Sequence, residues 1–141
     1  MALVDAGGDG EVYAVAAAIQ VTLEEAVDKG DPLGYGTTGW VKACGDVGTG
    51  AVHARVVALE AGGALAVISA APAALVGGDR FTTAPTPGAP VYVKDGATTG
   101  LYSETKPDVA NGDIKTVIGY SIDLENILIR CTEADLLASG H

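Results

Sequence analysis

Short apolar segments alternate with turn residues along the whole chain. The segments are roughly four to ten residues long and end at Gly, Pro, Asp or Asn, a spacing that favours strands over the helices of a bundle. We therefore predict strands at 12–21, 40–44, 52–59, 65–70, 90–94, 114–122 and 126–131.

The clearest two-residue alternation lies in 114–122. Its even-numbered residues, among them Ile118, Tyr120 and Ile122, form one face, which we expect to point toward a core. In residues 52–59, Val and Ala alternate at the even positions, although the opposite face also becomes apolar toward the end of the segment. Both patterns are typical of strands in a sheet with a buried face.

Two stretches have the features of a helix start. Thr22-Leu-Glu-Glu25 has the spacing of a capping box, and Thr132-Glu-Ala-Asp135 precedes two leucines, so one or two short helices are possible at most. The expected fold is all-β, a compact β-barrel or β-sandwich-like domain of short strands. Residues 1–11, rich in Gly and Asp, are predicted to be a flexible N-terminal arm, and residues 12–141 a single β-rich domain.

Composition limits the core and the partners. The chain has 141 residues and a mass of 14.0 kDa, and it is 48% hydrophobic but only 5% aromatic, so its core must consist of Ala, Val, Ile and Leu. Lys and Arg number 8 against 18 Asp and Glu, which gives a net charge of -10. This acidity opposes binding to nucleic acid or to an anionic membrane.

Targeting signals are not apparent in the sequence. The longest apolar runs, such as 12–19, are much shorter than the roughly 20 residues that cross a bilayer, so we expect no membrane span. The N-terminus has no basic region and carries Asp5 and Asp9, which argues against a signal peptide and favours a cytoplasmic product.

The sequence holds no convincing catalytic motif. Gly34-Tyr-Gly-Thr-Thr-Gly39 matches the glycine spacing of a dinucleotide-binding loop, but a strand-like run follows it instead of a helix, so we interpret it as a turn. His53 lies within a predicted strand without a nearby nucleophile motif, which favours a surface histidine. Cys44 and Cys131 lack metal-ligand spacing and are expected to be buried thiols. We expect no enzyme, no cofactor and no metal.

Most aspartates fall in predicted turns, where the Asp side chain caps the backbone. The segment 108–113 includes Asp108 and Asp113 but lacks the ligand pattern of a calcium loop. The aspartates assigned to turns are Asp28, Asp31, Asp79, Asp95, Asp108, Asp113 and Asp123.

Several segments, taken in order, resemble the cement (head decoration) proteins of tailed bacteriophages. They are VDKGDPLG at 27–34, GWVKA at 39–43, ARVVALEAG at 54–62, GAPVYV at 88–93, GLYSETKP at 100–107 and GDIKTVIGY at 112–120. The resemblance implies a compact β-domain that binds the major capsid protein on the outside of the shell, commonly as a homotrimer. The resemblance assigns no catalytic residue to this chain, and it implies a virion protein made in the host cytoplasm.

The function expected from these observations is stabilisation of a capsid by contact area. The alternatives are another virion component, such as a tail or head-fibre base domain, and a small all-β enzyme, for which Asp113 and His53 would be the residues to test. The candidate interface residues are Leu3, Val4, Val12, Tyr13 and Trp40. The first four could serve either as contacts to a neighbour or as a first strand packed on their own subunit, and Trp40 either as an interface anchor or as a core residue.

Overall fold

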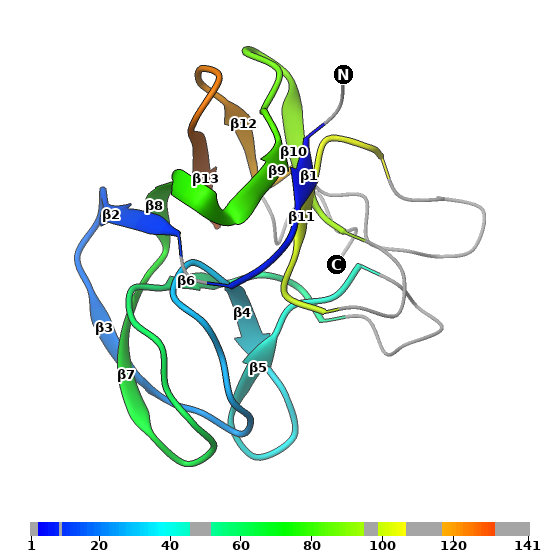
Figure 1. Cartoon of the computed structure of the whole chain (residues 1–141). Helices are drawn as coiled ribbons and strands as arrows, with labels where there is room; N and C mark the ends of the chain where they lie inside the picture. Colours follow the sequence, from blue (N-terminus) through cyan, green and yellow to red (C-terminus); the bar gives the residue numbers. More distant parts are fainter. Residues whose placement is uncertain (1–2, 9, 46–51, 95–98, 107–116, 132–141) are drawn as a thin grey trace.

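The molecule is built from short antiparallel strands (Figure 1). The structure is a computed structural model that describes the chain except residues 1–2, 9, 46–51, 95–98, 107–116 and 132–141. Its strands are β1 (Val4–Asp5), β2 (Glu11–Ala14), β3 (Ile19–Thr22), β4 (Pro32–Tyr35), β5 (Trp40–Lys42), β6 (Val56–Ala58), β7 (Val67–Ala71), β8 (Ala73–Gly77), β9 (Phe81–Thr83), β10 (Pro90–Val93), β11 (Tyr102–Ser103), β12 (Gly119–Ser121) and β13 (Ile127–Arg130). A single 3-10 turn, η1 (Gly78–Arg80), is the one helical element in the described residues. The predicted all-β fold is confirmed.

The strands form two sheets. The larger has the order β2-β8-β13-β12-β10-β11-β1-β9, and the smaller has the order β3-β7-β6-β4-β5. The smaller sheet curls so that its two end strands, β3 and β5, come together. Leu23, just after β3, forms a β-bridge with Trp40 at the start of β5. This contact gives the smaller sheet a barrel-like shape.

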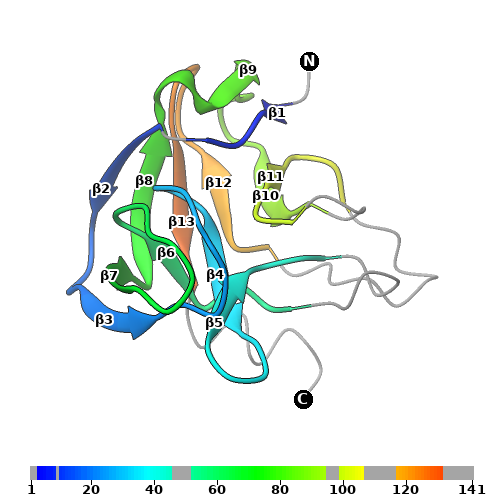
Figure 2. The same ribbon diagram turned by 60° about the horizontal axis from the view of Figure 1, so that its bottom comes forward.

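A two-stranded ribbon, with β2 and β3 on one side and β8 and β7 on the other, joins the two sheets at one side of the molecule (Figure 2). β2 and β3 follow each other in the chain, and they pair with β8 and β7, which also follow each other. The predicted strand 12–21 is therefore two strands, because the chain leaves one sheet and enters the other between Val15 and Ala18.

Strand β6 lies between two hydrophobic cores, which explains its apolar opposite face. Val57 belongs to the core of the larger sheet, together with Val76, Val91, Ile127 and Ile129. Val56 and Ala58 face the other way, into a second core inside the smaller sheet that contains Val21, Leu23, Val27, Leu33 and Ile68. Both cores consist almost entirely of aliphatic side chains, as the composition requires.

One of the two predicted short helices is absent from the described residues. Thr22–Glu25 is not a helix, because the Glu24 carboxylate accepts hydrogen bonds from the N–H groups of Thr38 (2.7 Å) and Gly39 (3.1 Å) and so holds the β4–β5 turn. The other proposed helix, 132–135, lies outside the described residues.

The prediction that the even-numbered residues of segment 114–122 point toward a core is confirmed only in part. Ile118 is buried, but Tyr120 and Ile122 are exposed, while Ser121 is fully buried. The polar Ser121 tolerates burial because its hydroxyl donates a hydrogen bond to Glu104 (2.5 Å). The hydrophobic alternation therefore did not identify the inward face from Gly119 onward.

Candidate functional site

An exposed apolar run is the most unusual surface feature of the protein. Every residue from Tyr13 to Ile19 is apolar, and every one is exposed, with Tyr13 at 60% and Val15 at 53% of full exposure. No charged residue occurs from Val12 to Ile19 in a chain of net charge -10. Contiguous apolar surface on an edge marks a place where a protein contacts a partner.

The first residues of this run, in β2, form the outer edge of the larger sheet, and its last residue, Ile19, begins β3 of the smaller sheet. β2 is the end strand of the larger sheet in the described part of the chain, and Figures 1 and 2 both place it at the side of the molecule, outside β8. Leu65 and Val67 are also exposed, but Val67 lies opposite Thr22 at the far end of β3, so they do not continue this run. We call this feature the β2 edge and define it as residues 12–19.

The five candidate interface residues do not form one patch. Val4 and Tyr13 are exposed but lie at opposite ends of the larger sheet, on β1 and β2. Val12 packs against the core of the larger sheet, and Trp40 packs against the core of the smaller sheet. The Trp40 ring also meets the Tyr35 ring edge-on, with the ring centroids 5.8 Å apart.

The N-terminal segment differs from a free arm over its described residues. Leu3 is only 5% exposed and belongs to the core of the larger sheet. β1 pairs with both β9 and β11, so the segment is an interior strand of that sheet. Of the two interpretations considered for Leu3, packing on its own subunit is the one that the structure has.

A buried ion-pair cluster holds this segment in place. The Arg80 side chain is fully buried, and its Nε lies 3.0 Å from Asp5 Oδ1. Its Nη1 donates to Asp31 Oδ1 (2.8 Å) and to Gly8 O (3.1 Å), and its Nη2 donates to Gly100 O (2.6 Å). Four segments distant in the sequence therefore meet at one guanidinium group.

Tyr102 completes the cluster. Its ring lies against the guanidinium, with Arg80 Cζ 5.4 Å from the ring centroid, and its hydroxyl donates to Gly30 O (2.6 Å). Burial raises the pKa of Tyr102 well above its ordinary value, and burial also raises the pKa of Asp31, although Arg80 opposes this second shift. The groups are enclosed and mutually satisfied, so the cluster is structural. Sequence analysis assigned Asp31 only to a turn and missed its pairing with Arg80.

A second carboxylate ties together three surface segments. Glu104 accepts hydrogen bonds from the backbone N–H groups of Leu3 (2.9 Å) and Thr86 (2.7 Å) and from the Ser121 hydroxyl. Partial burial acts to raise the pKa of Glu104, but these hydrogen bonds outweigh it and lower the pKa below its ordinary value. The lowered pKa means that the folded protein favours the charged form.

We expect Glu104→Gln to destabilise the protein by about 1 kcal/mol at neutral pH. The amide oxygen can replace only one of the two carboxylate oxygens, and the NH₂ group in the other position cannot accept the N–H of Leu3 or of Thr86. A group with a lowered folded-state pKa stabilises the fold above its unfolded-state pKa, and this contribution is lost as the pH falls through the folded-state value. The difference between wild type and variant in urea unfolding should therefore shrink below about pH 4. A difference that stays constant with pH would contradict this role.

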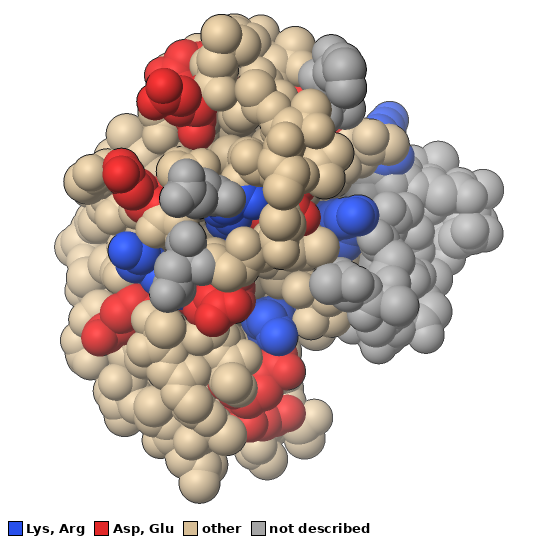
Figure 3. Space-filling view, viewed as in Figure 1, with Lys and Arg blue, Asp and Glu red and all other residues tan. Residues whose placement is uncertain are grey.

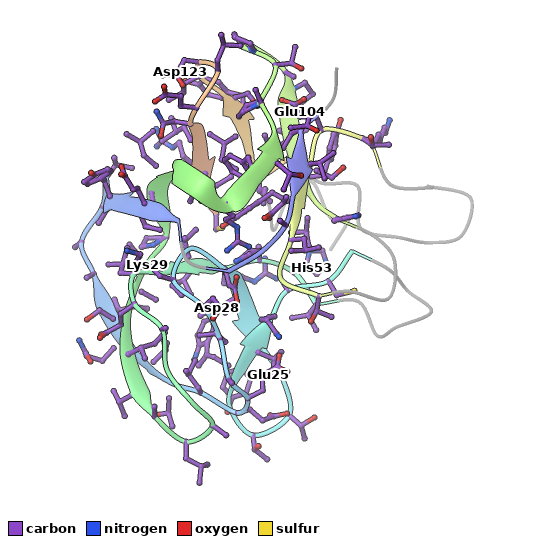
Figure 4. All side chains as sticks on the ribbon, viewed as in Figure 1. Glu25, Asp28, Lys29, His53, Glu104 and Asp123 are labelled. Atoms are coloured by element: carbon purple, nitrogen blue, oxygen red, sulfur yellow. The ribbon has the colours of Figure 1, made fainter. Side chains whose placement is uncertain are left out.

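Of the two residues considered for catalysis, His53 is the one in the described part of the chain. His53 lines a surface hollow of about 280 Å³ with Tyr35, Val52 and Arg55. Asp113 lies outside the described residues. Figure 4 shows His53 well apart from Glu104 and Asp123. Within the described ranges, no three or more His, Cys, Asp or Glu side chains are grouped so that they could hold a metal ion.

The remaining sequence features have structural roles. Gly36 N donates to Gly39 O (2.7 Å), so that part of the glycine string is a turn, as predicted. Asp123 accepts from the N–H groups of Glu125 and Asn126, both at 2.8 Å, as a turn aspartate does. Cys44 and Cys131 are buried thiols that form no disulfide.

The charged surface has no dominant basic area on the face that Figure 3 shows. Acidic side chains are scattered over this face, and Lys and Arg lie singly among them. Across the described residues, no helix has the length and apolarity to span a bilayer. The fold and surface thus define an all-β domain whose most distinctive feature is an exposed apolar edge. Comparisons with protein-family models, with curated proteins and with solved structures found no match to this chain.

Proposed function

We propose that this chain is a structural protein of a tailed-phage virion, which binds the major capsid protein on the outer surface of the shell as a homotrimer. Its function would be to stabilise the shell, because a protein that binds only the assembled state adds stability by mass action. The observation that carries the proposal is the β2 edge, an exposed and uncharged apolar surface on a small acidic domain.

Two further observations support this role. The order of the segments from 27–34 to 112–120 resembles that of the cement proteins, and the all-β fold agrees with the fold that the resemblance implies. The net charge of -10 disfavours contact with packaged DNA and suits a position outside the shell. An anchored protein of this kind needs contact area and does not need a chemical site.

The test uses phage heads that lack this protein. Purified wild-type chain should bind such heads in cosedimentation and should raise the temperature at which they release DNA. The variant Tyr13→Ser/Val15→Ser should bind about tenfold or more weakly, since it removes two exposed apolar side chains from the contact. Deleting residues 1–11 is a poorer test, because it would also remove the buried Leu3 and Asp5.

Leu124→Ser is the matched control. Leu124 is exposed at 65%, but it lies in the turn between β12 and β13, which β8 separates from β2 in the larger sheet. This variant should bind heads like wild type. Wild-type chain that leaves the heat resistance of the heads unchanged would refute the proposal, and binding to tail fractions alone would favour a tail or head-fibre base domain.

A further inference from the structure

The outer edge of β2 carries backbone groups that point away from the sheet. Val15 N donates to Ala73 O (3.0 Å), and in β2 Ala14 lies opposite Ala74 and Val12 opposite Val76. Successive residues of a strand direct their N–H and C=O groups to opposite sides. Glu11, Tyr13 and Val15 therefore bond toward β8, while the N–H and C=O of Val12 and Ala14 point outward.

No described strand pairs with that outer side. β2 is the end strand of the larger sheet. Among the described residues, no segment on the outer side of β2 forms a backbone hydrogen bond with the N–H or C=O of Val12 or Ala14. The neighbouring strand β3 is different, because Leu23 and Glu24 immediately after it meet Trp40, and Glu24 N donates to Trp40 O (2.9 Å). Outward backbone groups are therefore available on β2, while the end of β3 is already covered.

The side chains beside this edge allow another backbone to approach. Ala14, Ala16, Ala17 and Ala18 are exposed and small, and none of the residues 12–19 is charged. Natural proteins usually protect an open edge with charged residues, Pro or a bulge. The β2 edge has none of these within the run, which indicates that the edge is used for strand pairing.

Symmetry argues against a second copy as the partner within the proposed homotrimer. Pairing of the same edge with itself relates two copies by a two-fold axis, and a ring of three copies has no such axis. An uncharged extended segment of a different chain fits this edge better, because residues 12–19 carry no charge that could pair with a charged segment.

We infer that β2 accepts such a segment as an additional strand, so that the larger sheet continues into the partner by backbone hydrogen bonding. Within the proposed function, on which this inference rests, the segment belongs to the major capsid protein. The N–H and C=O groups of Val12 and Ala14 bind its backbone, and Tyr13 and Val15 flank it.

The test removes one outward N–H group that makes no hydrogen bond to the described residues of the free protein. Ala14→Pro deletes the outward N–H, and Pro is tolerated on an edge strand. It should weaken binding to heads about tenfold or more, as loss of one hydrogen bond and a steric clash with the added strand predict. Ala14→Thr keeps the N–H and adds a side chain suited to a strand, so it should bind within about twofold of wild type.

Amide hydrogen exchange gives a second readout that does not depend on the Pro variant. Binding of wild-type chain to heads should slow exchange at Val12 and Ala14, while the exposed turn residue Gly63 should be unaffected. This measurement decides the matter if Ala14→Pro loses its folded circular dichroism spectrum.

The outcomes separate this inference from the proposed function. If wild-type chain does not bind heads at all, the proposed function fails. If wild type binds and Ala14→Pro binds equally well, the capsid role stands and strand addition is wrong. Slow amide exchange at Val12 and Ala14 in the free protein would also overturn the inference, because the edge would then already be occupied. Self-association of the free chain that Ala14→Pro abolishes would overturn it for the same reason.

Discussion

Arg80→Met should lower the free energy of unfolding by about 3–5 kcal/mol, which is the usual cost of removing one partner from a buried ion pair. Met matches the length of the arginine stem but leaves Asp5 and Asp31 buried without their counter-charge. It also leaves the carbonyl oxygens of Gly8 and Gly100 without their donor from Arg80. Urea unfolding followed by circular dichroism measures the change.

The matched control for this prediction is Arg130→Met. Arg130 is the last residue of β13 and is exposed, so its replacement should change the unfolding free energy by less than about 0.5 kcal/mol. The double variant Asp5→Asn/Arg80→Met should lose less than the sum of the two single variants, because they break the same interaction. Additive losses would mean that Asp5 and Arg80 are not energetically coupled.

The loss should be largest at the N-terminal segment. Asp5 also accepts the backbone N–H of Tyr102 (2.8 Å), and Ala6 N donates to Arg80 O (2.9 Å), so the cluster fixes β1 against both of its neighbours. In Arg80→Met, amide exchange at Val4 and Asp5 should accelerate more than exchange at Ile127 and Ile129 in the core. The same cluster explains why residues 3–8 are not a free arm.

The sequence predicted the all-β class because class depends on local features. Short apolar segments and frequent turn residues are visible in any window of the chain, and β5, β7, β10 and β13 fall within or close to their predicted ranges. The prediction missed β4 and β8, because Pro and Gly within or beside these strands were taken as turn residues. Pro32 begins β4, and Pro72 separates β7 from β8.

The ion-pair cluster could not be predicted, because its members are far apart in the sequence. Asp5, Asp31 and Arg80 each lie in a glycine-rich stretch that is typical of a loop, and nothing local shows that these loops meet. The β2 edge is a similar case. A run of seven apolar residues ordinarily indicates a core strand, and only the sheet order shows that 13–19 lies at an edge.

Gly34 shows how tertiary structure changes the meaning of a local motif. The glycine string 34–39 was interpreted as a turn, yet Gly34 itself lies inside β4 and is buried. A Cβ atom built on Gly34 would overlap the carbonyl oxygen of His53 and lie 2.5 Å from Val52 Cγ1. The glycine is needed for the close approach of two backbones.

Gly34→Ala should therefore destabilise the protein by about 2–4 kcal/mol, in the range of overpacked core positions. The obstacle is a backbone carbonyl, which cannot rotate away as the end of a flexible side chain could, so β4 must move relative to the segment at His53. Gly63→Ala is the control, since its added Cβ meets no atom within 4 Å, and it should leave the unfolding free energy almost unchanged. Equal thermal midpoints for the two variants would show that β4 can shift without cost, and the close packing of β4 against residues 52–53 would then contribute nothing to stability.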